Sequence, residues 1–279
     1  MAAKILYNDF AYSWVAVAVM ASVGAQGKSL VAEAVTLALQ LQGLRVRVYS
    51  ADVQSKLKRK LGECVENLDI DLLAATEDDP LAMLRAYSAF SAAIGPGPEP
   101  HPSVVLDTAA TWDKPTLRYL HALGFDRQVV AAEGIPILVL VTTANTDAVK
   151  SMIEMTRKAR EALPLAKLVW ALNERHGPVF AHLDYDLLGF SPGYVQELRA
   201  SVTEVTIRGM DERLWVPVDR VGLSMEKFLD TDAAALVHFW PHQGKLLDPG
   251  SAAVVKDKIA EWIGAVMEAA SEAIGFCEP

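Results

Sequence analysis

The segment SVGAQGKSL, residues 22–30, combines small residues with one lysine and one serine. Small residues let the backbone curl so that successive N–H groups face one anion, and a helix that follows adds its N-terminal dipole. A lysine can pair with phosphate oxygens, and a serine hydroxyl is a hard oxygen ligand for Mg²⁺. The pattern therefore predicts a phosphate-binding loop, with Lys28 on the β and γ phosphates and Ser29 on Mg²⁺. The residues expected to bind the nucleotide there are Gly24, Ala25, Gln26, Gly27, Lys28, Ser29 and Leu30.

Two aspartates stand at the ends of apolar runs. Asp52 follows VRVYS, and Asp107 closes SVVLD. Ligands bind at the carboxyl ends of the strands in open α/β sheets, so both carboxylates are expected at the edge that carries the phosphate loop. We predict that Asp107 holds Mg²⁺ through a water molecule. Aspartate is also a common cap of turns and helices, and this alternative stays open for both.

The elements that must position these groups alternate along the chain. Apolar or alternating runs predict strands over residues 14–21, 45–50, 103–106, 135–141, 166–172, 203–208 and 213–216. Apolar residues at helical spacing, with breakers at the ends, predict helices over residues 27–42, 80–94, 114–123, 146–163 and 252–274.

Such alternation favours a mostly parallel sheet, because each crossover is long enough to hold a helix. The expected fold class is α/β: a doubly wound sheet with helices on both faces, in three α/β/α layers. The Pro- and Gly-rich segment 95–102 is interpreted as a surface loop, since a boundary there would separate strands that should be neighbours. We therefore expect residues 1–279 to form a single nucleotide-binding domain.

Composition narrows the class of protein. The net charge of −9 disfavours broad attraction to DNA or anionic lipid, which requires clustered Lys and Arg. The basic run KLKRK, residues 56–60, is interpreted as a solvated helix face, with a contact to DNA or a partner as the alternative. Cys64 and Cys277 are too few for a disulfide framework, and the start of the chain lacks the order of a signal peptide. A cytoplasmic location is expected.

Two apolar stretches raise the question of a membrane. The run at residues 14–21 is far shorter than the roughly 20 residues that a spanning helix needs. The helix expected over residues 252–274 could dock on the core or lie on a membrane surface. Its acidic polar face favours docking on the core.

Together these segments resemble the ParA/MinD group of phosphate-loop ATPases, whose loop reads KGGxGK[ST] and whose next strand ends D-x-D-x-Q. VGAQGKS and SADVQS align with these patterns, and VLDTAATWD is similar to the segment that carries the third-strand aspartate. LVWALNERHGPV and VPVDRVGLSMEKFLD are similar to the two segments on the adenine side. The resemblance covers residues 14–229, and LNERHGP is most similar to the TraL-type proteins of conjugative plasmids.

The resemblance implies roles for further residues. Asn173 would contact the adenine, and a loop with Pro217 and Val218 would lie beside the base. Asp52 would position the attacking water, so that the expected catalytic residues are Lys28, Asp52 and Asp107. It also implies bound ATP and Mg²⁺ and a nucleotide-dependent homodimer. The sequence does not identify a partner protein and gives no strong signal for direct binding to a membrane or nucleic acid.

Three departures from the group bear on mechanism. Val23 stands where the group has its signature lysine, which reaches the partner's phosphates in a dimer, and Ala25 and Ser50 replace a glycine and an aspartate. Positive charge placed against the transferred group accelerates phosphoryl transfer, so the loss of that lysine predicts slow turnover. Nucleotide binding should persist, because Lys28, Ser29 and Asp107 are retained.

The favoured function is a nucleotide-dependent switch that hydrolyses ATP slowly in plasmid partition, conjugative transfer or cargo positioning. The first alternative is a metabolic phosphate-loop enzyme, either a synthetase or a small-molecule kinase. Its acceptor pocket could draw on Asp113, Lys114, Glu174 and Arg175. The second alternative is a nucleotide-binding interaction protein without turnover.

Overall fold

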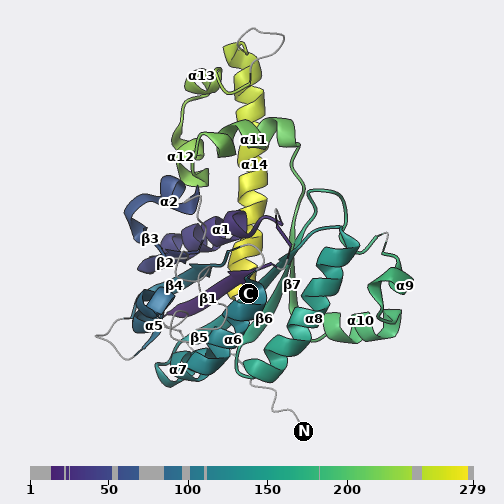
Figure 1. Ribbon diagram of the computed structural model, residues 1–279. Helices are drawn as coiled ribbons and strands as arrows, with labels where there is room; N and C mark the ends of the chain where they lie inside the picture. Colours follow the sequence, from purple (N-terminus) through teal and green to yellow (C-terminus); the bar gives the residue numbers. More distant parts are fainter. Residues whose placement is uncertain are drawn as a thin grey trace.

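The centre of the molecule is one sheet of parallel strands. The computed structural model describes residues 14–21, 23–24, 26–51, 56–68, 85–95, 101–109, 112–181, 183–240 and 247–275. The strands are β1 (Val15–Met20), β2 (Val46–Ser50), β3 (Val65–Asn67), β4 (Ser103–Asp107), β5 (Ile135–Thr142), β6 (Lys167–Asn173) and β7 (Thr203–Ile207). They lie in the order β3-β2-β4-β1-β5-β6-β7, and every neighbouring pair is parallel (Figure 1).

Strand β1 shows why the sheet is covered on both faces. Its sequence VAVAVM is apolar throughout, and every residue is fully buried. Val15, Val17 and Val19 belong to one core cluster, whereas Ala16, Ala18 and Met20 belong to the other. Because successive side chains of a strand point to opposite faces, a strand without a polar face needs a helical layer on each side.

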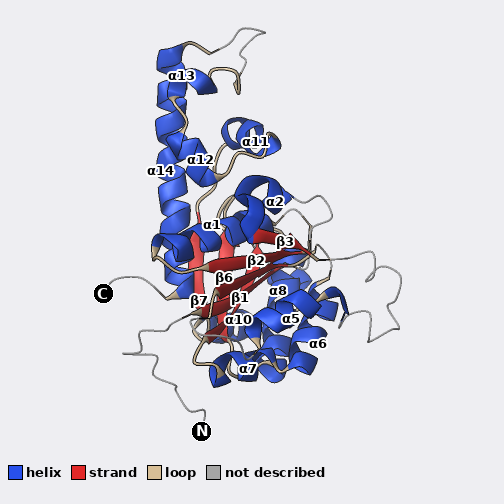
Figure 2. Ribbon diagram, turned by 90° about the vertical axis from the view of Figure 1, so that its left-hand side faces the viewer, coloured by secondary structure: helices blue, strands red, loops and turns tan. Residues whose placement is uncertain are grey.

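Two helical layers cover the two faces of the sheet (Figure 2). The core cluster on one face receives residues from α1 (Lys28–Leu41), α2 (Lys56–Leu61), α11 (Glu212–Arg220), α12 (Met225–Asp230), α13 (Ala233–Leu236) and α14 (Pro249–Ile274). The cluster on the other face receives residues from α5 (Ser88–Ile94), α6 (Asp113–Leu123), α7 (Phe125–Ala131), α8 (Thr146–Ala162), α9 (Tyr185–Leu188) and α10 (Pro192–Arg199). A short 3-10 helix, η1 (Gly62–Cys64), joins α2 to β3. The expected three-layer α/β/α fold is confirmed.

The C-terminal helix α14 docks on the core, as expected. Asp248 caps its start by accepting a hydrogen bond from the Ser251 backbone N–H at 3.0 Å. Ile259, Ile263 and Val266 are fully or almost fully buried, and the helix contacts α1 and β7. Its N-terminal part extends past the sheet, where α11, α12 and α13 lie beside it (Figures 1 and 2). No helix in the described part of the chain has the length and apolar character needed to cross a membrane.

Most expected elements agree with the structure to within a few residues, and the differences are instructive. The helix expected over residues 80–94 lies partly outside the described residues, and its described part includes α5. The strand expected over residues 213–216 is wrong, because these residues lie in α11. Asp211 caps that helix by accepting a hydrogen bond from the Arg213 N–H at 2.9 Å. Four residues are too few to separate strand alternation from helical spacing.

Candidate functional site

The carboxyl ends of the parallel strands open into one main cavity of about 510 Å³. Residues from the start of α1, from α2, from the segments that follow β4, β6 and β7, and from α11 and α14 line it. This edge of an open α/β sheet is where ligands bind, because the loops that leave the strands diverge there. The volume is within the usual range of small-molecule sites, roughly 300–1,000 Å³.

A glycine and an asparagine determine the backbone path of the phosphate loop. Gly27 has φ +93°, a left-handed conformation that favours glycine. A Cβ atom at Gly27 would lie 2.5 Å from Nδ2 of Asn173, so the space also excludes a side chain. The same Nδ2 donates a hydrogen bond to the backbone oxygen of Gln26 at 2.9 Å. The end of β6 therefore fixes the path of the loop as it enters α1.

A second contact ties the loop to β5. Thr143, which follows β5, donates a hydrogen bond through Oγ1 to Oε1 of Gln26 at 2.7 Å. The Gln26 Nε2 group donates to the backbone oxygen of Gly24 at 3.3 Å. Gln26 and Thr143 are both buried, so the bond between them is shielded from water. These contacts attach Gln26 to Gly24 and to the residue that follows β5.

A hydroxyl and a carboxylate meet beside the start of α1. The Ser29 Oγ–H donates a hydrogen bond to Oδ2 of Asp107 at 2.9 Å, although 78 residues separate the two in the sequence. Asp107 is fully buried at the end of β4. This pair of hard oxygen groups fits Mg²⁺, which binds through few protein groups and keeps waters or phosphate oxygens as its other ligands. No group of three or more His, Cys, Asp or Glu side chains that could hold a metal exists among the described residues.

Positive charge predominates in the cavity, in contrast to the chain as a whole. Five cationic side chains and two anionic ones line it. Arg175 donates a hydrogen bond to Oε1 of Glu212 at 2.6 Å, and this bond lowers the pKa of Glu212. Within the described residues, Lys28 and Lys56 make no ion pair. Their charge is available to an anionic ligand.

Lys60 ties three helices together beside the cavity. Its Nζ lies 2.8 Å from Oε2 of Glu33 in α1 and 2.7 Å from Oδ1 of Asp219 in α11. Glu33 is fully buried, and its Oε1 accepts a hydrogen bond from the Met225 N–H at 2.7 Å, at the start of α12. We call Glu33, Lys60 and Asp219 the ion triad. It joins the phosphate-loop helix to α2 and to the helices beyond the sheet edge.

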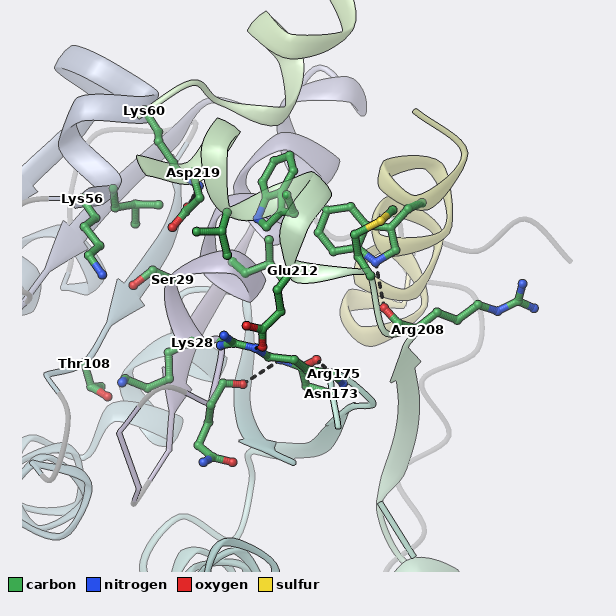
Figure 3. A pocket seen from close by; sticks show the side chains of 18 residues that line it. Lys28, Ser29, Lys56, Lys60, Thr108, Asn173, Arg175, Arg208, Glu212 and Asp219 are labelled. Carbon is green, nitrogen blue, oxygen red and sulfur yellow. Dashed lines mark hydrogen bonds and ion pairs between the residues drawn. The ribbon is translucent and has the colours of Figure 1, made fainter. Parts of the chain in front are cut away.

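An aromatic surface forms one end of the cavity, and Nζ of Lys60 lies 5.4 Å from the centroid of its Trp215 ring. The rings of Trp215 and Trp262 lie with their centroids 4.9 Å apart, and Met210 and Val216 line the same region. The Trp262 Nε1–H donates to the backbone oxygen of Arg208 at 2.7 Å, which fixes the indole. Figure 3 shows Arg175, Arg208 and Glu212 away from Lys56. A flat apolar ring fits this end, and an anion fits the other.

The structure brings together much of what the sequence singled out. Gln26, Gly27, Lys28, Ser29, Leu30 and Asn173 line the cavity, and Asp107 reaches it through Ser29. Gly24 is exposed and does not line the cavity. Ala25 and Asp52 lie outside the described residues. The expected roles of these residues in nucleotide binding stay predictions.

The structure corrects the prediction of a loop beside the base. Pro217 lies inside α11 rather than in a loop, and Val218 is fully buried in the core. Neither residue lines the cavity, whereas their neighbours Trp215 and Val216 do. The helix turns Val218 inward because it continues the apolar face begun by Leu214, four residues earlier.

Sequence reasoning missed the aromatic end and the ion triad. The interpretation of residues 56–60 as a solvated helix face is right for Lys58 and Arg59, which are exposed. It is wrong for Lys60, whose side chain is only 6% exposed. The signal was the spacing, since Lys60 lies three residues after the buried Leu57 on one face of a helix. No sequence pattern indicates that Trp215 and Trp262 line one cavity, because they come together only when α11 packs against α14.

No protein-family model matches the sequence, and no curated protein matches it significantly. Solved structures do match. A chain of the MinC:MinD cell division protein complex of Aquifex aeolicus has a TM-score of 0.52 at 12% identity, over 95% of this chain and 97% of that chain. The cell division protein MinD of Aquifex aeolicus has a TM-score of 0.50 at 12% identity, over 95% of this chain and 98% of that chain. The septum site-determining protein MinD of Pyrococcus horikoshii, complexed with Mg-ADP, has a TM-score of 0.50 at 14% identity, over 94% and 96%. At these identities the likeness shows the fold: this chain is folded like MinD.

Proposed function

We propose that this chain, folded like MinD, is a nucleotide-dependent switch that binds ATP with Mg²⁺ and hydrolyses it slowly. One observation carries the proposal: a single cavity joins Lys28 and the Ser29–Asp107 pair to an aromatic end that fits a base. The MinD protein of Pyrococcus horikoshii, which shares the fold, is complexed with Mg-ADP, and this supports the choice of ligand. Plasmid partition, conjugative transfer and cargo positioning are the roles we propose, with a homodimer as the ATP-bound form.

Different residues would hold the phosphates, the Mg²⁺ ion and the base. Lys28 and the N–H groups at the start of α1 would hold the phosphates. Ser29 would bind Mg²⁺ directly, and Asp107 would hold it through water. The ion, when bound, supplies positive charge against the β and γ oxygens. Asn173 and the aromatic surface would lie on the side of the base.

The alternative of a metabolic enzyme has less support. An acceptor pocket requires several polar groups that face the transferred phosphate. Of Asp113, Lys114, Glu174 and Arg175, only Arg175 lines the cavity, and Glu212 already accepts its hydrogen bond. Asp113 lines a separate hollow of about 10 Å³.

We expect the protein to bind ATP tightly in Mg²⁺ but to release phosphate slowly, at a rate per molecule that does not rise with protein concentration. The reason is Val23, an apolar residue that lines a small hollow with Met152 and Met155 of α8 and cannot stabilise charge on the phosphates. Calorimetry with ATP, GTP and ADP, followed by size exclusion with each nucleotide and a phosphate-release assay, checks this. Absence of nucleotide binding would reject the proposed function. Fast release that climbs with concentration would contradict the role given to Val23.

We expect Asp107→Asn to remove most of the Mg²⁺ dependence of ATP binding. Asp107 is buried, and the substitution keeps its shape while it removes the charge that orients Ser29 and the waters of the ion. Loss of such an outer group lowers metal affinity by about 10- to 100-fold. Calorimetric titration of ATP with Mg²⁺ and with EDTA gives the ratio of the two affinities, which should fall toward one. Ser29→Ala should act in the same direction, and an unchanged ratio in both variants would contradict the metal site.

A further inference from the structure

Lys56 is a cation of the main cavity that lies outside the phosphate loop. It is the first residue of α2, is exposed, and lines the cavity together with Lys28, Ser29 and Thr108. Lys60 also lines the cavity, but Glu33 and Asp219 neutralise its charge. In the described part of the chain no carboxylate pairs with Lys56. An ammonium group on a cavity wall that pairs with none of the described carboxylates is suited to an anionic ligand.

Leu57 and Lys60 attach α2 to the rest of the fold. Leu57 is fully buried in the core, and Lys60 is fixed by the ion triad. Lys56 and Lys60 are four residues apart, which places them on the same face of a helix. The face that Lys60 turns toward α1 is therefore also the face that carries Lys56. The next two basic residues, Lys58 and Arg59, are exposed and do not line the cavity.

The position of Lys56 within the cavity indicates which phosphate it meets. Figure 3 shows Lys56 on one side of Lys28 and Ser29, and Asn173 and Arg175 on the other. Within the aromatic surface, Trp262 lies beside Arg208, whose backbone oxygen accepts a hydrogen bond from its indole N–H, whereas the Trp215 ring is near both Trp262 and Lys60. A base that packs on Trp262 is therefore on the side of Arg208. A nucleotide whose ring lies there and whose phosphates pass Lys28 points its last phosphate toward Lys56.

We propose that Lys56 binds the terminal phosphate of a nucleoside triphosphate from within the same chain, so that the site distinguishes triphosphate from diphosphate. The inference rests on the proposed nucleotide-binding function. Because α2 is tied to α1 and α11 through the ion triad, a contact at Lys56 reports the terminal phosphate to both helices. A diphosphate lacks the group that reaches Lys56, so it leaves α2 without this contact.

The test compares a triphosphate with a diphosphate in matched variants. The affinities of Mg²⁺-ADP and of an ATP analogue with a non-hydrolysable β–γ bridge are measured by calorimetry for the unmodified protein, Lys56→Gln, Lys56→Arg and the control Lys58→Gln. A charged hydrogen bond predicts a loss of about tenfold for the triphosphate in Lys56→Gln. The affinity for ADP should change less than about twofold, and Lys56→Arg should retain most of the triphosphate affinity. Thermal melting should be unchanged in all variants, because Lys56 and Lys58 are exposed.

Each outcome of this test has one meaning. Equal losses for triphosphate and diphosphate would show a general electrostatic effect and overturn the role at the terminal phosphate. A triphosphate affinity that is the same in Lys56→Gln and Lys58→Gln would overturn it as well. Failure of the unmodified protein to bind either nucleotide would reject the proposed function itself, and the inference with it.

Discussion

Replacing Lys28 by methionine should weaken triphosphate binding by about 100-fold or more. Lys28 is the second residue after Gln26 in the loop that Asn173 and Thr143 hold open, and it is only 9% exposed. Its ammonium group makes no ion pair in the described part of the chain, so a phosphate would be its charged partner. Methionine keeps the aliphatic stem and removes the charge, which separates loss of binding from loss of packing.

Calorimetry with ATP and Mg²⁺ measures this effect, and a urea denaturation curve shows whether the variant is folded. Lys28→Ala should lose binding to the same extent, although it also removes part of the buried stem. Lys58→Met, which removes an exposed cation from α2, should bind as the unmodified protein does. An ATP affinity in Lys28→Met within a factor of about three of the unmodified protein would contradict the assignment of the phosphate loop.

Replacing Lys60 by methionine should lower the free energy of unfolding by about 3–5 kcal/mol at neutral pH. Glu33 is fully buried and would lose the cation that lies 2.8 Å away. Burial lowers the pKa of Lys60, but the carboxylates of Glu33 and Asp219 outweigh that effect and hold this pKa above its ordinary value. The lysine is therefore charged at neutral pH, and the loss is that of a charged partner. Chemical denaturation gives the free energy, with Lys58→Met, expected within about 0.5 kcal/mol, as the control.

The pH dependence of the Lys60→Met penalty separates charge from packing. Burial already raises the pKa of Glu33 above 4.5, and Lys60 opposes this rise. Without Lys60 the pKa should rise further, so that folded Glu33 holds a proton at a pH where the unfolded chain has lost it. A group with a raised pKa in the folded state stabilises at low pH, and that contribution is lost as the pH rises. The penalty should therefore be smaller at pH 5 than at pH 8, and Glu33→Gln should relieve much of it. A penalty that is the same at both pH values would contradict this account.

Much of the fold can be predicted where the hydrophobic pattern of a segment agrees with its burial in the folded protein. The run at Val15–Met20 is apolar on both faces, and it lies at the centre of the sheet, where helices cover both faces. The strand β3 was missed because it has three residues, two of them exposed. The strand expected at residues 213–216 failed for a related reason, since a short alternation of apolar residues also fits one turn of α11.

The site is predictable only where one segment carries its own chemistry. The phosphate loop could be found because Gly27, Lys28 and Ser29 are adjacent in the sequence and act together. The two partners of Lys60 could not be found from the sequence. Glu33 lies before it in the sequence and Asp219 lies far after it, and both contact Lys60 only when α1, α2 and α11 have packed. Trp215 and Trp262 are hidden in the same way, since a tryptophan on a helix indicates core packing more often than a ligand surface.

The place of β1 in the sheet has a consequence for biosynthesis. This strand is made first among the seven, yet its neighbours are β4 and β5, and Val15 pairs with Ile135. A ribosome adds roughly 5–20 residues per second, so VAVAVM stays without both neighbours for on the order of 10 s. Pairing across such sequence separations is slow even in the complete chain, and an uncovered apolar strand is a template for aggregation during that time. Chaperone dependence of the nascent chain, and lower yield when it is made quickly at high temperature, are therefore expected from the strand order alone.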